Sequence, residues 1–246
     1  MPRPYVTTTQ NAAAQTAHRW KGRIFFAFAD QGLVSASNFL LTILYAWWLP
    51  LDDFGRYVVV SWFINWGIFP LAAALSGAGA AGIVRALQNL LTPIIQFNAA
   101  LNLAILPRVA DQVADHGAPY ARRFALRATG AFAGTVLLYC AAILAAAPFI
   151  LPLLYGKPEI TASGALLWPL ALAVLCEAAR AASSMSLLAM RRTRIVLVAR
   201  LVALAAFAMA GFTLAPPMGF IGILWANAAG TAAGAVVVIA AALRAK

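Results

Sequence analysis

Four stretches of the sequence contain no Asp, Glu, Lys or Arg, namely residues 57–84, 86–107, 128–156 and 201–243. A helix needs about 20 apolar residues to cross the hydrocarbon core of a bilayer, and the last stretch is long enough for nearly two crossings. Hydrophobic residues make up 63% of the chain and charged residues only 10%, which leaves too few polar groups to cover a soluble globule. The sequence therefore predicts an all-α, polytopic membrane helix bundle.

Polar breaks between the apolar runs divide the chain. Residues 1–23 are polar and basic, and we assign them to the cytoplasmic surface or the membrane interface. Residues 24–246 form the predicted transmembrane domain, in which residues 109–127 are the longest polar stretch and must be a surface loop or an interfacial helix. The pattern predicts about seven long helices, near residues 24–50, 57–82, 85–108, 128–154, 161–190, 194–214 and 219–243.

The ionisable residues exclude several classes of function. The net charge is +11, but the arginines cluster between apolar runs, where they are topology signals beside anionic lipid. Cys140 and Cys176 lie in apolar runs without metal-binding or redox spacing. Asp111, Asp115 and His116 have one-turn spacing, but we interpret them as solvated surface residues. We therefore expect no nucleic-acid partner, no metal and no cofactor.

The distribution of basic residues gives two conflicting topologies. Positive-inside counting backwards from the C-terminus places residues 191–194 and Arg122, Arg123 and Arg127 in the cytoplasm. Counting forwards from a cytoplasmic N-terminus disagrees with this at residues 57–85, because seven crossings cannot leave both basic ends on one side. Either that segment does not cross the membrane, or the charge at one end of the chain does not follow the positive-inside rule, or the chain lacks spans.

The predicted helix 85–108 carries a polar stripe in one wedge about 100° wide, formed by Arg85, Gln88, Asn89, Thr92 and Gln96. A helix in hydrocarbon can carry such a stripe only toward protein or water, because an unpaired buried amide is costly. We therefore predict that the stripe faces an internal cavity or a tightly paired helix interface. Pro93, midway along, bends this helix.

Further polar residues lie inside predicted spans. Glu177 and Arg180 are three residues apart on one helix face, where an ion pair can neutralise both. Asp30 lies near the start of the first span and must be close to the headgroups, paired, or a site for a coupling ion. Asn98 and Asn102, one turn apart, are placed to bridge to a neighbouring helix.

Two stretches resemble a known family. Residues 29–57, ADQGLVSASNFLLTILYAWWLPLDDFGRY, contain an Asp-Gln, small residues, an Asn-Phe and an acidic Phe-Gly-Arg-Tyr turn. This order resembles the opening of polysaccharide flippases of the multidrug/oligosaccharidyl-lipid/polysaccharide exporter superfamily. Residues 79–111, GAAGIVRALQNLLTPIIQFNAALNLAILPRVAD, resemble that family's second-half helix, which ends in Leu-Pro-Arg. The resemblance implies the second lobe of a two-lobe flippase plus one first-lobe helix, with several first-lobe helices missing.

The resemblance implies a function in the cell envelope. A multi-pass protein of the bacterial inner membrane would move a polyprenyl-diphosphate-linked saccharide, such as a polysaccharide or lipopolysaccharide O-antigen repeat unit, by alternating access. Arginine suits the diphosphate and amides suit sugar hydroxyls, so the stripe from Arg85 to Gln96 is the expected substrate cavity. In the lipid-II flippase branch an arginine lies nearer the helix proline, close to the register of Gln88 here. Expected partners are membrane lipid, further copies of the chain, or other polysaccharide-assembly proteins.

Two alternatives remain open. Because helices are missing, the chain can be an incomplete, non-transporting remnant or a partner subunit of such a flippase. A membrane enzyme acting on polyprenyl phosphates would need clustered carboxylates, a metal, or a nucleophile with a base. The chain has seven acidic residues, and no catalytic motif surrounds them, so we expect it not to be an enzyme.

Overall fold

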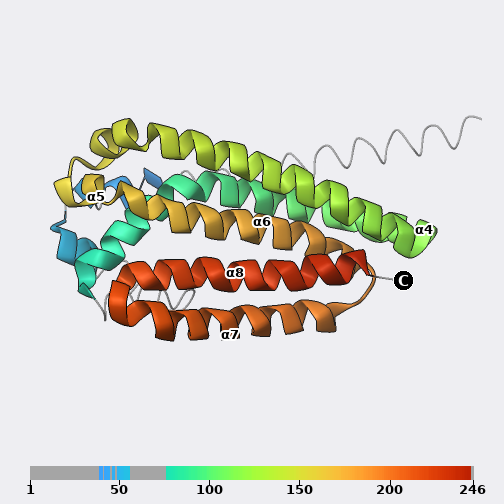
Figure 1. Cartoon of the computed structure of the whole chain (residues 1–246). Coiled ribbons are helices and arrows are strands. Elements are labelled where there is room, and N and C mark those ends of the chain that lie inside the picture. The colour runs from blue at the N-terminus through green and yellow to red at the C-terminus, as the bar shows by residue number, and fades with distance from the viewer. Residues whose placement is uncertain (1–38, 41, 45, 48, 56–75, 245–246) are drawn as a thin grey trace, which may run out of the picture.

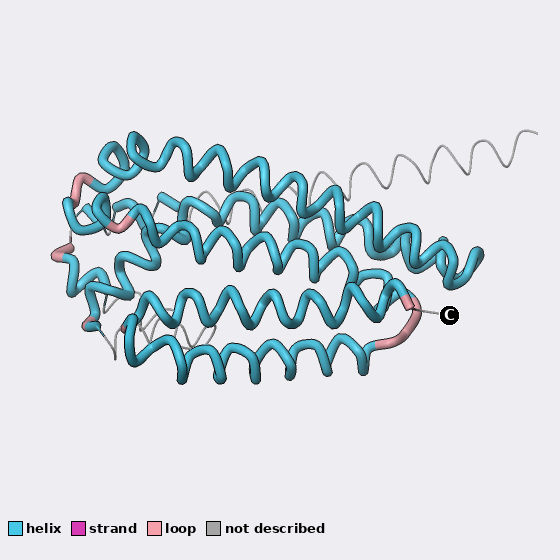
Figure 2. Tube along the Cα trace, in the orientation of Figure 1, coloured by secondary structure: helices cyan, strands magenta, loops and turns pink. Residues whose placement is uncertain are grey.

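The structure, a computed structural model, describes residues 39–40, 42–44, 46–47, 49–55 and 76–244. This part of the chain is helical, joined by short loops, and contains no strand (Figures 1 and 2). Its principal elements are α4 (Ala78–Tyr155), α5 (Pro158–Ala162), the 3-10 helix η1 (Gly164–Leu166), α6 (Leu167–Ala189), α7 (Thr193–Met218) and α8 (Phe220–Leu243). The prediction of an all-α helix bundle is confirmed.

Helix α4 consists of two antiparallel arms that meet at Gly117 (Figure 1). We call residues 78–116 the first arm and residues 118–155 the second arm. Gly117 has φ 67° and ψ −160°, a conformation that L side chains rarely adopt, so glycine is needed at the turn. At 1.5 Å per residue each arm is about 57 Å long, and a bilayer's hydrocarbon core is about 30 Å thick. The arms therefore extend beyond the hydrocarbon.

The tip of this hairpin is where the sequence analysis placed a surface loop or an interfacial helix, over residues 109–127. The structure differs, because both arms stay helical up to Gly117 and the polar stretch extends the two spans. Val109, Val113 and Ala121 form a small buried cluster with Met190 at the end of α6. This apolar stripe within a polar stretch holds the arms together outside the predicted spans.

Length and composition make α4, residues 164–189, α7 and α8 capable of crossing a membrane. Glycines and basic residues mark the points at which these helices end. Gly156 ends α4 in a left-handed conformation with φ 60°, and Gly219 separates α7 from α8 with φ 59°. The basic cluster at residues 191–194 lies where α6 gives way to α7, as predicted. The predicted turn at residues 215–219 is shorter than expected, because α7 continues to Met218.

Close backbone packing joins α7 to α8. A Cβ atom added to Gly230 would lie 2.7 Å from the carbonyl oxygen of Ala203, and one added to Gly222 would lie 2.2 Å from that of Leu214. Small residues at such positions let membrane helices approach closely. On its other faces α7 is exposed, with Ala199 its one buried residue, as expected for a helix surrounded by lipid.

The loops sort into two ends of the bundle (Figure 1). The tip of α4, the α6–α7 link and the C-terminus share one end, which we call the basic end. Residues 49–55, Lys157 and Gly219 belong to the opposite end: Lys157 donates a hydrogen bond to the Leu49 carbonyl oxygen, and a Cβ atom on Gly219 would lie 3.7 Å from the Ser76 hydroxyl oxygen.

The two sides of the predicted span 57–82 meet in the structure. A Cβ atom on Gly55 would lie 1.7 Å from the Ala78 carbonyl oxygen, so these residues are in direct contact. The chain therefore leaves the described part at Gly55 and re-enters it at Ser76 at the same end. Of the predicted span 57–82, residues 57–75 lie outside the described residues and residues 78–82 belong to α4.

Candidate functional site

A polar seam joins the first arm of α4 to the helical residues 39–40, 42–44 and 46–47, which we call residues 39–47 for short. We define it as Arg85, Asn89 and Thr92 on α4, with Phe39 and Thr42 opposite. Arg85 is 6% exposed and donates from Nη2 to the Thr42 hydroxyl at 3.5 Å. Asn89 is fully buried and donates from Nδ2 to the Phe39 carbonyl oxygen at 3.3 Å. The polar stripe therefore faces protein, and its buried members form a tightly paired helix interface.

The five predicted cavity residues do not share one environment. Arg85, Asn89 and Thr92 are buried, whereas Gln88 and Gln96 are partly exposed at the border of the seam. Thr92 donates to the Gln88 carbonyl oxygen of its own helix at 3.1 Å. The five residues thus share one helix face, but only three of them are buried in the bundle.

Two tyrosines of the second arm complete the surroundings of the seam, and the sequence analysis missed both. Tyr155 donates to the Ala86 carbonyl oxygen at 2.8 Å, and Tyr139 donates to that of Leu90 at 2.7 Å. Near the opposite end from the basic cluster, the Trp47 ring nitrogen donates to the Leu154 carbonyl oxygen at 2.5 Å. These bonds span 49 to 107 residues in sequence, so no local pattern signals them.

The first arm also has unused hydrogen-bonding capacity. The side-chain oxygens of Asn89, Asn98 and Asn102 are buried and accept no hydrogen bond within the described part of the chain. We predicted that Asn98 and Asn102 bridge to a neighbouring helix, and for their carbonyl oxygens the described residues provide no such bridge. A buried acceptor without a partner is costly, so these three oxygens are suited to receive donors from a ligand or water.

Glu177 and Arg180 on α6 form the predicted ion pair. Arg180 donates from Nε to Glu177 Oε2 at 2.7 Å and from Nη2 to Glu177 Oε1, so the contact is bidentate. The Arg180 side chain is 11% exposed and that of Glu177 is 44% exposed. The carboxylate neutralises a guanidinium that cannot lose its proton. Nearby, the hydroxyls of Thr129 and Ser183 lie 2.7 Å apart and link the second arm to α6.

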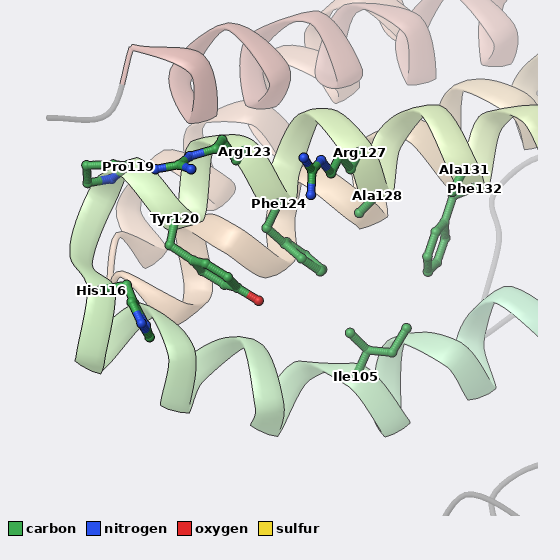
Figure 3. Close-up of a pocket in the computed structure, with 10 residues that line it drawn as sticks. All are labelled: Ile105, His116, Pro119, Tyr120, Arg123, Phe124, Arg127, Ala128, Ala131 and Phe132. Carbon is green, nitrogen blue, oxygen red and sulfur yellow. The ribbon is translucent and has the colours of Figure 1, made fainter.

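A partly open groove lies between the two arms near the basic end (Figure 3). Its volume is about 760 Å³. The lining residues come from both arms and are Ile105, His116, Pro119, Tyr120, Arg123, Phe124, Arg127, Ala128, Ala131 and Phe132. None of the five predicted cavity residues is among them. The spacing of His116, Tyr120 and Phe124 was the available sequence signal, but it becomes a groove only once the arms fold back.

Asp30, the third intramembrane charge singled out in the sequence, lies outside the described residues. Asp111, Asp115 and His116 are exposed at the tip of α4. Among the described residues, no three His, Cys, Asp or Glu side chains gather as a metal ion would require. Comparison with known proteins does not assign the site, because no protein-family model, curated protein or solved structure matches this chain.

Proposed function

We propose that this chain transports a lipid-linked oligosaccharide across the bacterial inner membrane by alternating access, with the polar seam as part of its substrate path. The observation that carries the proposal is the burial of Arg85 and Asn89 inside a bundle of membrane-crossing length. Charged and amide side chains inside membrane spans are rare and costly, and they commonly mark the path of a polar substrate. A polyprenyl diphosphate carrying a saccharide offers the phosphate and hydroxyl groups that such residues recognise.

The hydrogen bonds of the seam favour exchange with a substrate. The bond from Arg85 to Thr42 is at the long limit for a hydrogen bond, at 3.5 Å. A guanidinium forms shorter, paired bonds with phosphate, so Arg85 is suited to bind a diphosphate. The free carbonyl oxygens of Asn89, Asn98 and Asn102 supply acceptors for sugar hydroxyls along the same arm.

The position of the seam defines the proposed movement. Arg85 lies about two turns into α4, which starts at the end of the bundle opposite the basic end (Figure 1). The basic end is expected on the cytoplasmic side. Residues 39–47 therefore close the outer side of the path in this conformation. Their movement away from the first arm would expose Arg85 and Asn89 and release the substrate outward. Pro93 and Pro107 within this arm provide points at which the helix can bend.

A second function, a partner subunit without transport activity of its own, is favoured by one observation. The groove near the basic end is lined by none of the residues predicted to bind substrate. A single chain whose seam stays shut would have no path across the membrane.

Transport by the purified chain separates the two functions. Proteoliposomes containing a fluorescent polyprenyl-diphosphate saccharide are treated with an impermeant quencher, which reports how fast the substrate changes leaflet. We expect the wild-type chain to transport the substrate. Arg85→Ala should strongly reduce the rate, and Arg108→Ala should preserve it. Arg108 is the matched control because it is an exposed arginine on the same arm. No transport above empty liposomes would support the partner-subunit function, and equal activity of both variants would remove Arg85 from the path.

A further inference from the structure

We propose that the groove between the two arms of α4 binds a phospholipid with an anionic headgroup from the cytoplasmic leaflet. This site is distinct from the polar seam and does not depend on the transport proposal. The groove is about 760 Å³ in volume and partly open, which falls within the usual size range of small-molecule sites. A ligand of this groove must match a lining that is charged in one part and apolar in another.

Along the second arm the lining is mixed basic and aromatic up to Arg127 and apolar beyond it (Figure 3). His116 lies beside Gly117, where the arms meet, and Arg123 and Arg127 follow about two and three helical turns later. Beyond Arg127 the lining continues with Ala128, Ala131 and Phe132, and Ile105 points into the groove from the other arm. A phospholipid has the same order of groups, with an anionic phosphate at one end and acyl chains at the other.

The depth of the groove matches the boundary between headgroups and hydrocarbon. Arg127 is the last charged residue before the uncharged run 128–156, and Arg108 is the first one after the uncharged run 86–107. The two arginines lie at similar distances from the turn at Gly117, so they mark one level on the hairpin. The groove extends to both sides of this level, because Tyr120 lies toward the tip and Phe132 toward the membrane. A bilayer lipid would reach it without leaving its leaflet.

Charge selects an anionic headgroup over a zwitterionic one. Arg123 and Arg127 line the groove, whereas no Asp or Glu is among its lining residues. Asp111 and Asp115 lie on the first arm near the tip, outside that lining. The same end carries residues 191–194, which include three arginines, so the electrostatic potential at this end is positive. Basic pockets of this kind on the cytoplasmic side bind anionic lipid headgroups.

A free phosphate would use only part of this site. Ile105, Phe124 and Phe132 offer apolar surface in the groove, which inorganic phosphate cannot cover but an acyl chain can. Tyr120 stacks over Phe124 with ring centroids 6.4 Å apart, so the polar and apolar parts of the lining are joined by a continuous aromatic surface. We therefore assign the site to a lipid.

Photo-crosslinking in defined bilayers tests the assignment. The full chain is reconstituted in phosphatidylcholine containing a small fraction of phosphatidylglycerol that carries a photoreactive group on its acyl chain. Labelled residues are mapped by mass spectrometry, and a photoreactive phosphatidylcholine is the reference lipid. We expect labels within residues 124–132, with phosphatidylglycerol preferred roughly tenfold at low salt. Labelling elsewhere, or without preference for phosphatidylglycerol, would overturn the proposal.

Two variants with matched controls separate charge from shape. The double change Arg123→Gln and Arg127→Gln should abolish the preference, whereas Arg122→Gln with Arg194→Gln removes the same charge outside the groove and should preserve it. Ala131→Trp should fill the groove and reduce labelling without altering charge, and Leu138→Trp on the same arm should not. Equal losses in a variant and its control would overturn the proposal. Competition by inorganic phosphate as strong as that by unlabelled phosphatidylglycerol would do the same, since it would indicate a simple anion site.

Discussion

Removing Glu177 should destabilise the bundle more than removing Arg180 or removing both. Glu177→Gln leaves the Arg180 guanidinium, whose side chain is 11% exposed, without its carboxylate. Arginine cannot neutralise itself by losing a proton. Breaking a buried pair costs about 3–5 kcal/mol, and an isolated Arg at a helix centre costs about 2.5–3.5 kcal/mol in membrane insertion. We expect a loss of about 3 kcal/mol, at the lower end because the Glu177 side chain is 44% exposed.

The reverse change should cost less. Arg180→Met leaves a carboxylate that is partly exposed and keeps part of its hydration, so we expect a loss of about 1–2 kcal/mol. The double variant strands no charge and loses only the mutual hydrogen bonds, so its loss should be about 1 kcal/mol. The coupling free energy between the two residues is then about 3–4 kcal/mol, at or above the upper end for contacting pairs.

Equilibrium unfolding of the wild type, the two single variants and the double variant in mixed micelles measures this coupling. Arg122→Gln is the control, because an exposed surface change should stay within about 0.5 kcal/mol. Additive losses in the double variant would refute the reasoning, since they would mean that the two side chains do not stabilise each other. A Glu177→Gln loss no larger than that of Arg180→Met would contradict the argument that the more deeply buried partner is the costlier one to leave unpaired.

Two further predictions concern packing and topology. Gly230→Ala should lower the free energy of unfolding by about 1–3 kcal/mol, because it forces α7 and α8 apart. Gly211→Ala should be neutral or stabilising, because its Cβ would meet its nearest neighbour at 3.8 Å. Thermal unfolding measures both variants, and equal effects would reject the close-packing account. Single cysteines at Gly77, Gly117 and Pro217, in a background lacking Cys140 and Cys176, should react with an impermeant reagent in intact cells at Gly77 and Pro217 but not at Gly117. Reaction at Gly117 would show that the basic end faces outward.

The all-α class and several helix ends in the described part could be predicted from the sequence, because they depend on local chemistry. Uncharged runs mark the helices, and Gly156 ends α4 in a left-handed conformation. The basic residues 191–194 mark the boundary between α6 and α7. The ion pair was equally local, since Glu177 and Arg180 are one turn apart. What the pattern could not show was the extension of helix through residues 109–127. That stretch is polar in composition, and its small apolar stripe becomes stabilising only when Val113 and Ala121 meet across the turn.

The surroundings of the polar stripe could be predicted only as two alternatives. A wedge of polar side chains requires a protein or water environment, but the sequence does not say which. Thr42 and Phe39, which receive hydrogen bonds from Arg85 and Asn89, lie 43 and 50 residues away in sequence. The groove was missed for the same reason, since it exists only between segments that are separated by a turn. Contacts of this range follow from the packing of the bundle and have no periodic signal.

Locking the seam tests the transport proposal most directly. Cysteines replacing Trp47 and Leu154 of the second arm, which are joined by a hydrogen bond, would be bridged with a reducible bifunctional thiosulfonate in a background lacking Cys140 and Cys176. This bridge holds Trp47 against the bundle beside the seam and so is expected to keep the seam closed. A bridge between Gly211→Cys and Ile223→Cys, across α7 and α8, is the control because those helices already pack tightly. Bridging the seam should stop transport of the lipid-linked saccharide in proteoliposomes, reduction should restore it, and the control bridge should leave it unchanged. Undiminished transport with the seam bridged would show that residues 39–47 do not gate the path.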